Sequence, residues 1–311
     1  MTTAKTAAQH STHSTRAALA SVSLALVLLV AKAWAAYLTD STAMLGSLAD
    51  TALDVIASLT TLMGVRIAAQ PADLDHRFGH GKAEALVSLA QVVLIAISAV
   101  GIMWRAMDRL VHGAETEAMG AGIAVSILAI GLTFVLLWYQ RQVIERTGSV
   151  AIKTDNVHYK SDLMLNGAVI VALVLDQALH VAGADALFGI GIALWLLWGA
   201  WRASSEAVHQ LMDREWPEEE RQEFLDAAAK FEEFRGLHDM RTRKSGTLRF
   251  VQFHVWVPAH WTVQEAHDRL DRAEEELQQS FPDTEILIHV DPEGQTDRET
   301  LLPQEITEQA S

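Results

Sequence analysis

Six apolar stretches constrain the fold of this chain more than any other feature. They cover residues 17–38, 42–65, 83–104, 118–138, 163–179 and 184–201. Several are about 20 residues long, which is the length that an α-helix needs to cross a hydrocarbon core of ~30 Å. The fifth helix is expected to begin earlier, near Val150, on polar residues that are costly inside a membrane and usually functional. The pattern predicts six transmembrane helices.

Charge is distributed unevenly along the chain. From Glu206 onward there are 25 acidic and 11 basic residues, whereas the preceding part contains 14 acidic and 13 basic ones. A nearly neutral apolar half joined to a charged half indicates a membrane domain followed by a soluble domain. No basic patch favours a nucleic acid as partner. We therefore expect a disordered tail over 1–15, a six-helix domain over 16–205, a metal-binding soluble domain over 206–292 and a disordered tail over 293–311.

Lysine and arginine indicate how the predicted helices are oriented. Basic residues occur before the first helix, between the second and third, between the fourth and fifth, and directly after the sixth. The connections on the other side contain few, Arg109 among them. Cytoplasmic segments of membrane proteins carry an excess of Lys and Arg. Both termini are therefore expected to be cytoplasmic.

The second and fifth helices carry matching pairs of candidate metal ligands. Asp50 and Asp54 are four residues apart among apolar neighbours, and His158 and Asp162 repeat this spacing, so each pair shares one helix face. Two carboxylates at membrane depth repel each other, and a divalent cation would neutralise both. Four nitrogen and oxygen ligands suit tetrahedral zinc. The alternative is that these side chains only form hydrogen bonds between helices.

The connection between the second and third helices contains a further group of candidate ligands, namely Asp73, His76 and His80. Gly79 and Gly81 would allow the backbone to bend around a metal ion. Polar loops often contain several histidines without binding metal, so both interpretations stay open. The chain has no cysteine. Any metal must then be held by His, Asp or Glu, which suits zinc, manganese or ferrous iron better than copper(I).

The soluble part alternates between helical and strand patterns. A helix is expected from Pro217 to about residue 234, strands over 236–244 and 247–257, a helix over 262–280 and a strand over 285–290. The order αββαβ predicts a small domain in which helices cover a short sheet. Several of its residues either converge into a zinc site or lie separately on the surface. They are His238, His254, His267, His289 and Asp291.

Taken together, these motifs resemble the cation diffusion facilitator family. The motifs are LADTALD at 48–54, PAD at 71–73, FGHGKAE at 78–84, HYKSD at 158–162 and IHVDP at 288–292. They occur in order along nearly the whole chain, and the pattern is most similar to the bacterial YiiP-like efflux transporters of zinc and ferrous iron. Lys160 departs from the glutamine expected in those relatives and adds a positive charge near the candidate site.

The resemblance implies a homodimer in the bacterial inner membrane with a cytoplasmic ferredoxin-like domain. It implies proton-coupled export of divalent metal by alternating access, with Zn²⁺ as the first candidate and Cd²⁺ or Fe²⁺ as further substrates. The paired helix residues would form the transport site, the loop residues a second site, and the ligands of the soluble domain a binuclear site at the dimer interface. That bound zinc would be structural or regulatory.

Three other functions are weighed against zinc export. A manganese- or iron-selective exporter is the nearest, but manganese prefers an all-oxygen site and His158 supplies nitrogen. A membrane metalloenzyme would need a catalytic base, and the sequence contains no His-Glu-x-x-His helix and no nucleophile beside a base. The chain is therefore not expected to be an enzyme. A metal receptor that signals without moving ions is the third alternative.

Overall fold

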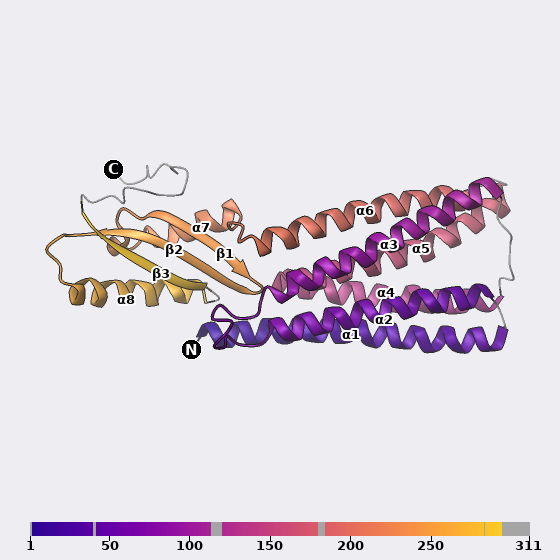
Figure 1. The fold of residues 1–311 in the computed structure, drawn as a ribbon, viewed down its shortest axis with the longest axis horizontal. Helices are drawn as coiled ribbons and strands as arrows, with labels where there is room; N and C mark the ends of the chain where they lie inside the picture. The colour runs from indigo at the N-terminus through magenta and orange to yellow at the C-terminus, as the bar shows by residue number, and fades with distance from the viewer. Residues whose placement is uncertain (1, 40–41, 113–119, 180–183, 283, 294–311) are drawn as a thin grey trace. The chain divides into compact units, whose positions relative to one another are not determined.

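The computed structural model describes residues 2–39, 42–112, 120–179, 184–282 and 284–293 (Figure 1). The chain divides into two compact units. One is His10–Val208, and the other comprises His209–Ser311 together with Met1–Gln9.

Six long helices form the first unit, as the apolar stretches predict. They are α1 (Thr2–Thr39), α2 (Thr42–Ala68), α3 (Ala83–His112), α4 (Gly120–Thr147), α5 (Val150–Leu179) and α6 (Ala184–Leu211). All except α5 contain a described segment that is long and apolar enough to cross a membrane. The first half of α5 is polar, and the helix begins at Val150 as expected. Gly148 adopts φ +63° in the tight connection from α4, a conformation that favours glycine.

The N-terminal segment differs from expectation. We expected residues 1–15 to be a disordered tail, but α1 already begins at Thr2. Extending an existing helix costs far less than nucleating one, and alanine, the best helix former, occurs at Ala4, Ala7 and Ala8. The expected C-terminal tail over 293–311 lies outside the described residues except for Glu293.

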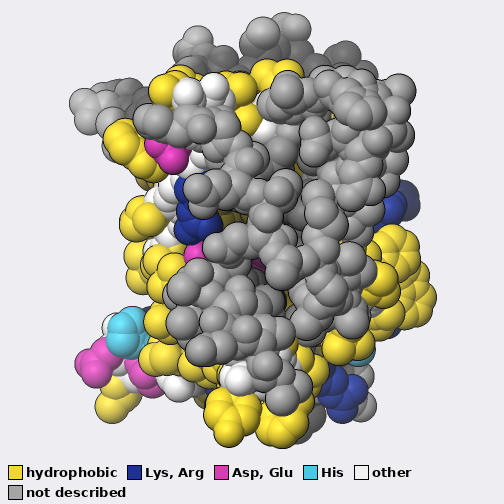
Figure 2. Space-filling model, turned by 90° about the vertical axis from the view of Figure 1, so that its right-hand side faces the viewer, with side chains coloured by type: hydrophobic (Ala, Val, Ile, Leu, Met, Phe, Trp, Pro, Cys, Tyr) yellow, Lys and Arg dark blue, Asp and Glu magenta, His cyan; other side chains and the backbone are white. Residues whose placement is uncertain are grey.

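Large apolar side chains remain exposed on the outer faces of the long helices, among them Trp34, Ile97, Trp104 and Phe134. Among the described residues on the face drawn in Figure 2, many exposed side chains are hydrophobic. Contiguous apolar surface of this kind marks an interaction with another protein or with a membrane. Combined with helix lengths of 27 residues or more, it supports a membrane-spanning unit.

The helices α2 and α3 pack closely at Gly64. A Cβ atom added to Gly64 would lie 2.4 Å from Cγ2 of Val87. Such a distance is far below van der Waals contact, so only glycine lets the two helices approach this closely. This contact fixes α2, which carries two of the candidate ligands, against α3.

The second unit has the predicted αββαβ order. Its elements are α7 (Glu218–Ala228), the 3₁₀ turn η1 (Glu232–Phe234), β1 (His238–Ser245), β2 (Leu248–Val257), α8 (Val263–Ser280) and β3 (Thr284–Pro292). The sheet order is β1-β2-β3, with β1 antiparallel and β3 parallel to β2. The first helix is shorter than predicted because η1 replaces its last turn, where Phe231 and Phe234 pack their rings 5.5 Å apart.

One face of this sheet is covered by both helices. Val251, Phe253 and Val255 alternate along β2 and are fully buried, and they form a core with Phe224 of α7 and Leu277 of α8. Residues that alternate with them point to the opposite face of the sheet. That second face carries His254, and the candidate metal ligands of the strands gather there.

Candidate metal centres

Three of the four candidate ligands in the membrane unit lie together. Ligand atoms of Asp54 on α2 and of His158 and Asp162 on α5 all lie within 4.8 Å of one another. The Nε2 atom of His158 is 3.1 Å from Oδ1 of Asp54 and 3.9 Å from Oδ2 of Asp162. His158 is buried, with 8% of its surface exposed. We call these three residues the transmembrane cluster.

Asp50, the fourth candidate, has a different partner. Its Oδ1 atom lies 3.6 Å from a guanidinium nitrogen of Arg105 on α3, and the two side chains are 56% and 69% exposed. On the neighbouring α1, Lys32 donates a hydrogen bond to the hydroxyl of Thr51 at 2.6 Å. The structure therefore brings three of the four predicted ligands together, while the fourth forms an ion pair.

A buried tyrosine holds α5 against α2 and α1. The Tyr159 hydroxyl lies 2.8 Å from the Ser58 hydroxyl on α2 and donates to the backbone carbonyl of Ser21 at 3.0 Å. Ser58 is one helical turn from Asp54, and Tyr159 is next to His158. This contact therefore fixes the two helices directly beside the transmembrane cluster.

Asp155 is a buried acid that lies outside the motifs of the sequence. It is fully buried, and its carboxylate accepts hydrogen bonds from Ser21 at 2.6 Å, Gln140 at 2.8 Å and Gln91 at 3.3 Å. These partners come from α1, α4 and α3, and Thr61 of α2 contributes a longer contact of 3.4 Å. One sequence signal could have revealed Asp155: it is an acidic residue inside a predicted membrane helix, three positions before His158.

The loop between α2 and α3 brings its three candidates together as the loop cluster, Asp73, His76 and His80. Oδ1 of Asp73 accepts backbone hydrogen bonds from His76 at 2.6 Å and Asp75 at 2.9 Å. The imidazoles of His76 and His80 each lie 3.3 Å from the Asp73 carboxylate. The backbone hydrogen bonds, chiefly that from His76, lower the pKa of Asp73, so this ligand stays ionised at acidic pH.

Strand register assembles the candidates of the soluble domain. His238 of β1 pairs with His254 of β2, which in turn pairs with His289 of β3. Asp291 lies 2.8 Å from His254 Nδ1 and 3.3 Å from His238 Nε2, and these three residues are the tail cluster. His289 Nε2 lies 3.4 Å from the other Asp291 oxygen.

A hydrogen bond to the backbone orients His238 for metal binding. Its Nδ1–H donates to the carbonyl of Gly236 at 2.8 Å, which leaves Nε2 free on the side of Asp291. Histidine ligands in proteins are usually oriented by such a hydrogen bond from the other ring nitrogen. The imidazole and carboxylate donors of the tail cluster suit zinc.

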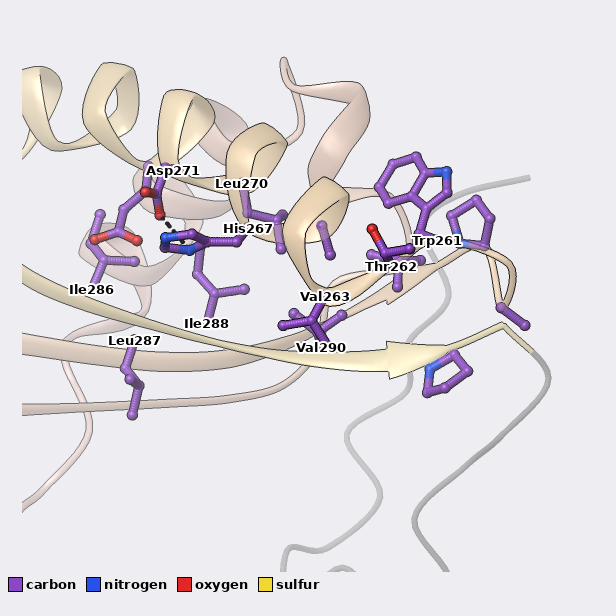
Figure 3. A pocket seen from close by; sticks show the side chains of 16 residues that line it. Trp261, Thr262, Val263, His267, Leu270, Asp271, Ile286, Leu287, Ile288 and Val290 are labelled. Atoms are coloured by element: carbon purple, nitrogen blue, oxygen red, sulfur yellow. Dashed lines mark ion pairs between the residues drawn. The ribbon is translucent and has the colours of Figure 1, made fainter.

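His267 does not join the tail cluster within the part of the chain that the structure describes. It lies on α8, is 67% exposed, and pairs with Asp271 at 3.2 Å. Both residues line a groove of about 660 Å³ between α8 and β3, whose other walls are mostly apolar (Figure 3). Because α8 covers the opposite face of the sheet, His267 cannot reach the other four candidate ligands of the same chain.

Family models match both units of the chain. The model described as cation efflux transmembrane domain matches residues 18–212, and the model described as cation efflux protein, cytoplasmic domain, matches residues 216–293. The chain belongs to the cation efflux family. This cation efflux protein is accordingly a multi-pass membrane transporter and not an enzyme, and the predicted resemblance is confirmed.

Known relatives cover most of the length of this cation efflux protein. It is 41% identical over 278 residues to the cation-efflux pumps FieF of Klebsiella pneumoniae and Cronobacter sakazakii, covering 89% of this chain and 92% of each relative. Two solved structures of CzrB, one of them a zinc form, are each 38% identical to it. They cover 28% and 25% of this chain and 99% of their own, with TM-scores of 0.25 and 0.23.

Proposed function

We propose that this chain exports a divalent transition metal, Zn²⁺ before others, from the cytoplasm in exchange for protons. The observation that carries this proposal is the transmembrane cluster, in which one imidazole and two carboxylates from two helices lie within 4.8 Å. Such nitrogen and oxygen donors bind zinc at about 2.0–2.2 Å, so small side-chain movements suffice to place an ion between them. Asp50, one turn away on α2, would complete a four-ligand set.

Proton coupling follows from the chemistry of these ligands. Metal binding requires a neutral imidazole and ionised carboxylates, so protons and metal compete for the same atoms. His158 Nε2, which faces both carboxylates, is the atom at which this competition would occur. Metal would enter from the cytoplasm, the helices α2 and α5 would shift to open the site outward, and protons from outside would release the ion.

The donor set also bears on metal choice. His158 supplies nitrogen, whereas manganese prefers oxygen ligands alone, so Zn²⁺, Cd²⁺ and Fe²⁺ are better candidates than Mn²⁺. The absence of cysteine disfavours copper(I).

The loop and tail clusters would hold zinc that is not transported. In the tail cluster, zinc would tie β1, β2 and β3 together through His238, His254 and Asp291. His267 lies across the sheet from these residues, so it could add to a metal site only through a second copy of the chain. In the proposed homodimer, the tail zinc would be structural or regulatory.

The proposed setting is the bacterial inner membrane with both termini in the cytoplasm. Because the chain has no cysteine, a single cysteine introduced at the exposed Glu218 can be labelled selectively. In inside-out vesicles, a membrane-impermeant maleimide should label this variant directly. Labelling only in right-side-out vesicles would contradict the proposed orientation.

Zinc flux into proteoliposomes under an imposed pH gradient tests the proposal. We expect zinc movement to be driven by protons moving in the opposite direction, and to collapse when the gradient is dissipated. Asp226→Ala, an exposed substitution on α7, serves as the matched control. Zinc binding without flux would favour a receptor, and flux that ignores the pH gradient would contradict antiport.

A further inference from the structure

The ion pair between Asp50 and Arg105 is not explained by zinc transport alone. Arg105 lies three residues before the end of the apolar segment Ala83–Asp108 of α3, and a charged side chain on such a segment usually has a functional partner. Its guanidinium lies 3.6 Å from the carboxylate of Asp50. Lys32, the nearby cation of α1, contacts the hydroxyl of Thr51 instead. Among the contacts described, Arg105 is thus the cation that holds the fourth candidate ligand.

We propose that Arg105 is a tethered cation that competes with the transported metal for Asp50. The inference rests on the proposed function, because it assigns Asp50 to the same site. A guanidinium stays charged at every physiological pH, so it cannot yield Asp50 by losing a proton. Metal can recruit Asp50 only when Arg105 moves away. Conversely, the return of Arg105 to Asp50 removes one ligand from the metal and weakens its binding.

The surroundings of the ion pair permit this exchange. Both side chains are more than half exposed, so no tight packing holds the guanidinium in place. Asp50 precedes Asp54 by one turn, closer to the start of α2 at Thr42. With cytoplasmic termini, that end of α2 faces outward. Arg105 therefore takes over the ligand on the exit side, where metal has to be released.

The competition predicts that removing the charge of Arg105 strengthens metal binding. Equilibrium zinc binding would be measured on the full chain in lipid nanodiscs, with His80→Ala and His254→Ala present to disable the loop and tail clusters. Arg105→Gln should lower the dissociation constant about fivefold, the upper range for an exposed ion pair. Arg105→Lys should stay close to the parent, because it keeps the positive charge. Proteoliposome flux should show a lower KM and a slower turnover for Arg105→Gln.

Two controls separate this role from a structural one. Arg141→Gln removes an exposed ion pair with Glu145 on α4 and should leave zinc affinity unchanged. In an Asp50→Asn background, Arg105→Gln should have no further effect, because the contested ligand is gone. An unchanged or weaker affinity in Arg105→Gln would overturn the inference, as would a full effect that persists without Asp50. A parent that binds no zinc would instead contradict the proposed function itself.

Discussion

Asp155→Asn should destabilise the membrane unit strongly, although it changes a carboxylate to an amide of the same shape. The carboxylate is fully buried and accepts hydrogen bonds on both oxygens. In asparagine one oxygen becomes an NH₂ group. If this group replaces Oδ2, it faces the donors Ser21 and Gln140, and if it replaces Oδ1, it faces Gln91 and Thr61.

The size of the effect follows from the number of lost acceptors. Either orientation leaves two donors opposite another donor, and a buried unsatisfied group costs about 1–3 kcal/mol. Allowing the side chains to rearrange, we expect Asp155→Asn to lower the free energy of unfolding by about 2–4 kcal/mol. His158 lies one turn away on α5, so zinc affinity at the transmembrane cluster should also fall.

Thermal unfolding in detergent, followed by tryptophan fluorescence, measures the loss of stability. Asp226→Asn is the matched control, because its carboxylate is exposed and the substitution should stay within about 0.5 kcal/mol. The double variant Asp155→Asn/Gln140→Leu should lose less stability than the sum of the two single variants, because both substitutions remove the same hydrogen bond. A melting temperature equal to that of the parent would refute the reasoning.

Three further outcomes are expected. Gly64→Ala should destabilise the membrane unit by about 1–3 kcal/mol, because its Cβ would meet Val87, and Val87→Ala should restore much of the loss in a melting experiment. Because its pKa is lowered, Asp73 stays ionised as pH falls. The stability that this carboxylate gives the folded loop is therefore fully present above the ordinary pKa of an aspartate and is lost only at lower pH. Asp73→Asn should therefore weaken zinc binding to the loop cluster at neutral and at mildly acidic pH, as measured by equilibrium zinc titration; an unchanged affinity would be the contrary result. Thr262→Ala should cost the soluble domain about 1 kcal/mol in denaturant unfolding, because Thr262 caps α8, and no change would show that the cap is dispensable.

The three clusters differ in exposure, and this difference bears on their roles. His158 of the transmembrane cluster is buried, whereas Asp73 and His76 of the loop cluster are open to solvent. An ion held by exposed ligands is expected to exchange directly with the surroundings. An ion between α2 and α5 can leave only if helices or side chains move. That requirement suits a transport site better than a storage site.

Much of the fold could be predicted because it depends on local patterns. Helix length and the polar start of α5 are visible in the chain, and the i, i+4 spacing placed His158 and Asp162 on one face. The strands were visible through alternation, so the convergence of His238 and His254 needed only the correct register.

Other features depend on which helices become neighbours, and periodicity does not specify that. The buried position of Asp155 requires α1, α2, α3 and α4 to meet around α5. The partner of Asp50 is likewise set by the packing of α3 on α2, so spacing placed Asp50 beside Asp54 but could not identify Arg105. The position of His267 depends on packing in the same way, because α8 covers one face of the sheet while the strands present His254 and its partners on the other.

The central claim is that metal crosses the membrane through the transmembrane cluster and not through the other two. The most direct test compares zinc flux into proteoliposomes for three variants, each of which disables one cluster: Asp162→Ala, His80→Ala and His254→Ala. We predict that Asp162→Ala abolishes proton-driven flux, while the loop and tail variants retain it at least in part. Undiminished flux in Asp162→Ala protein would contradict the account.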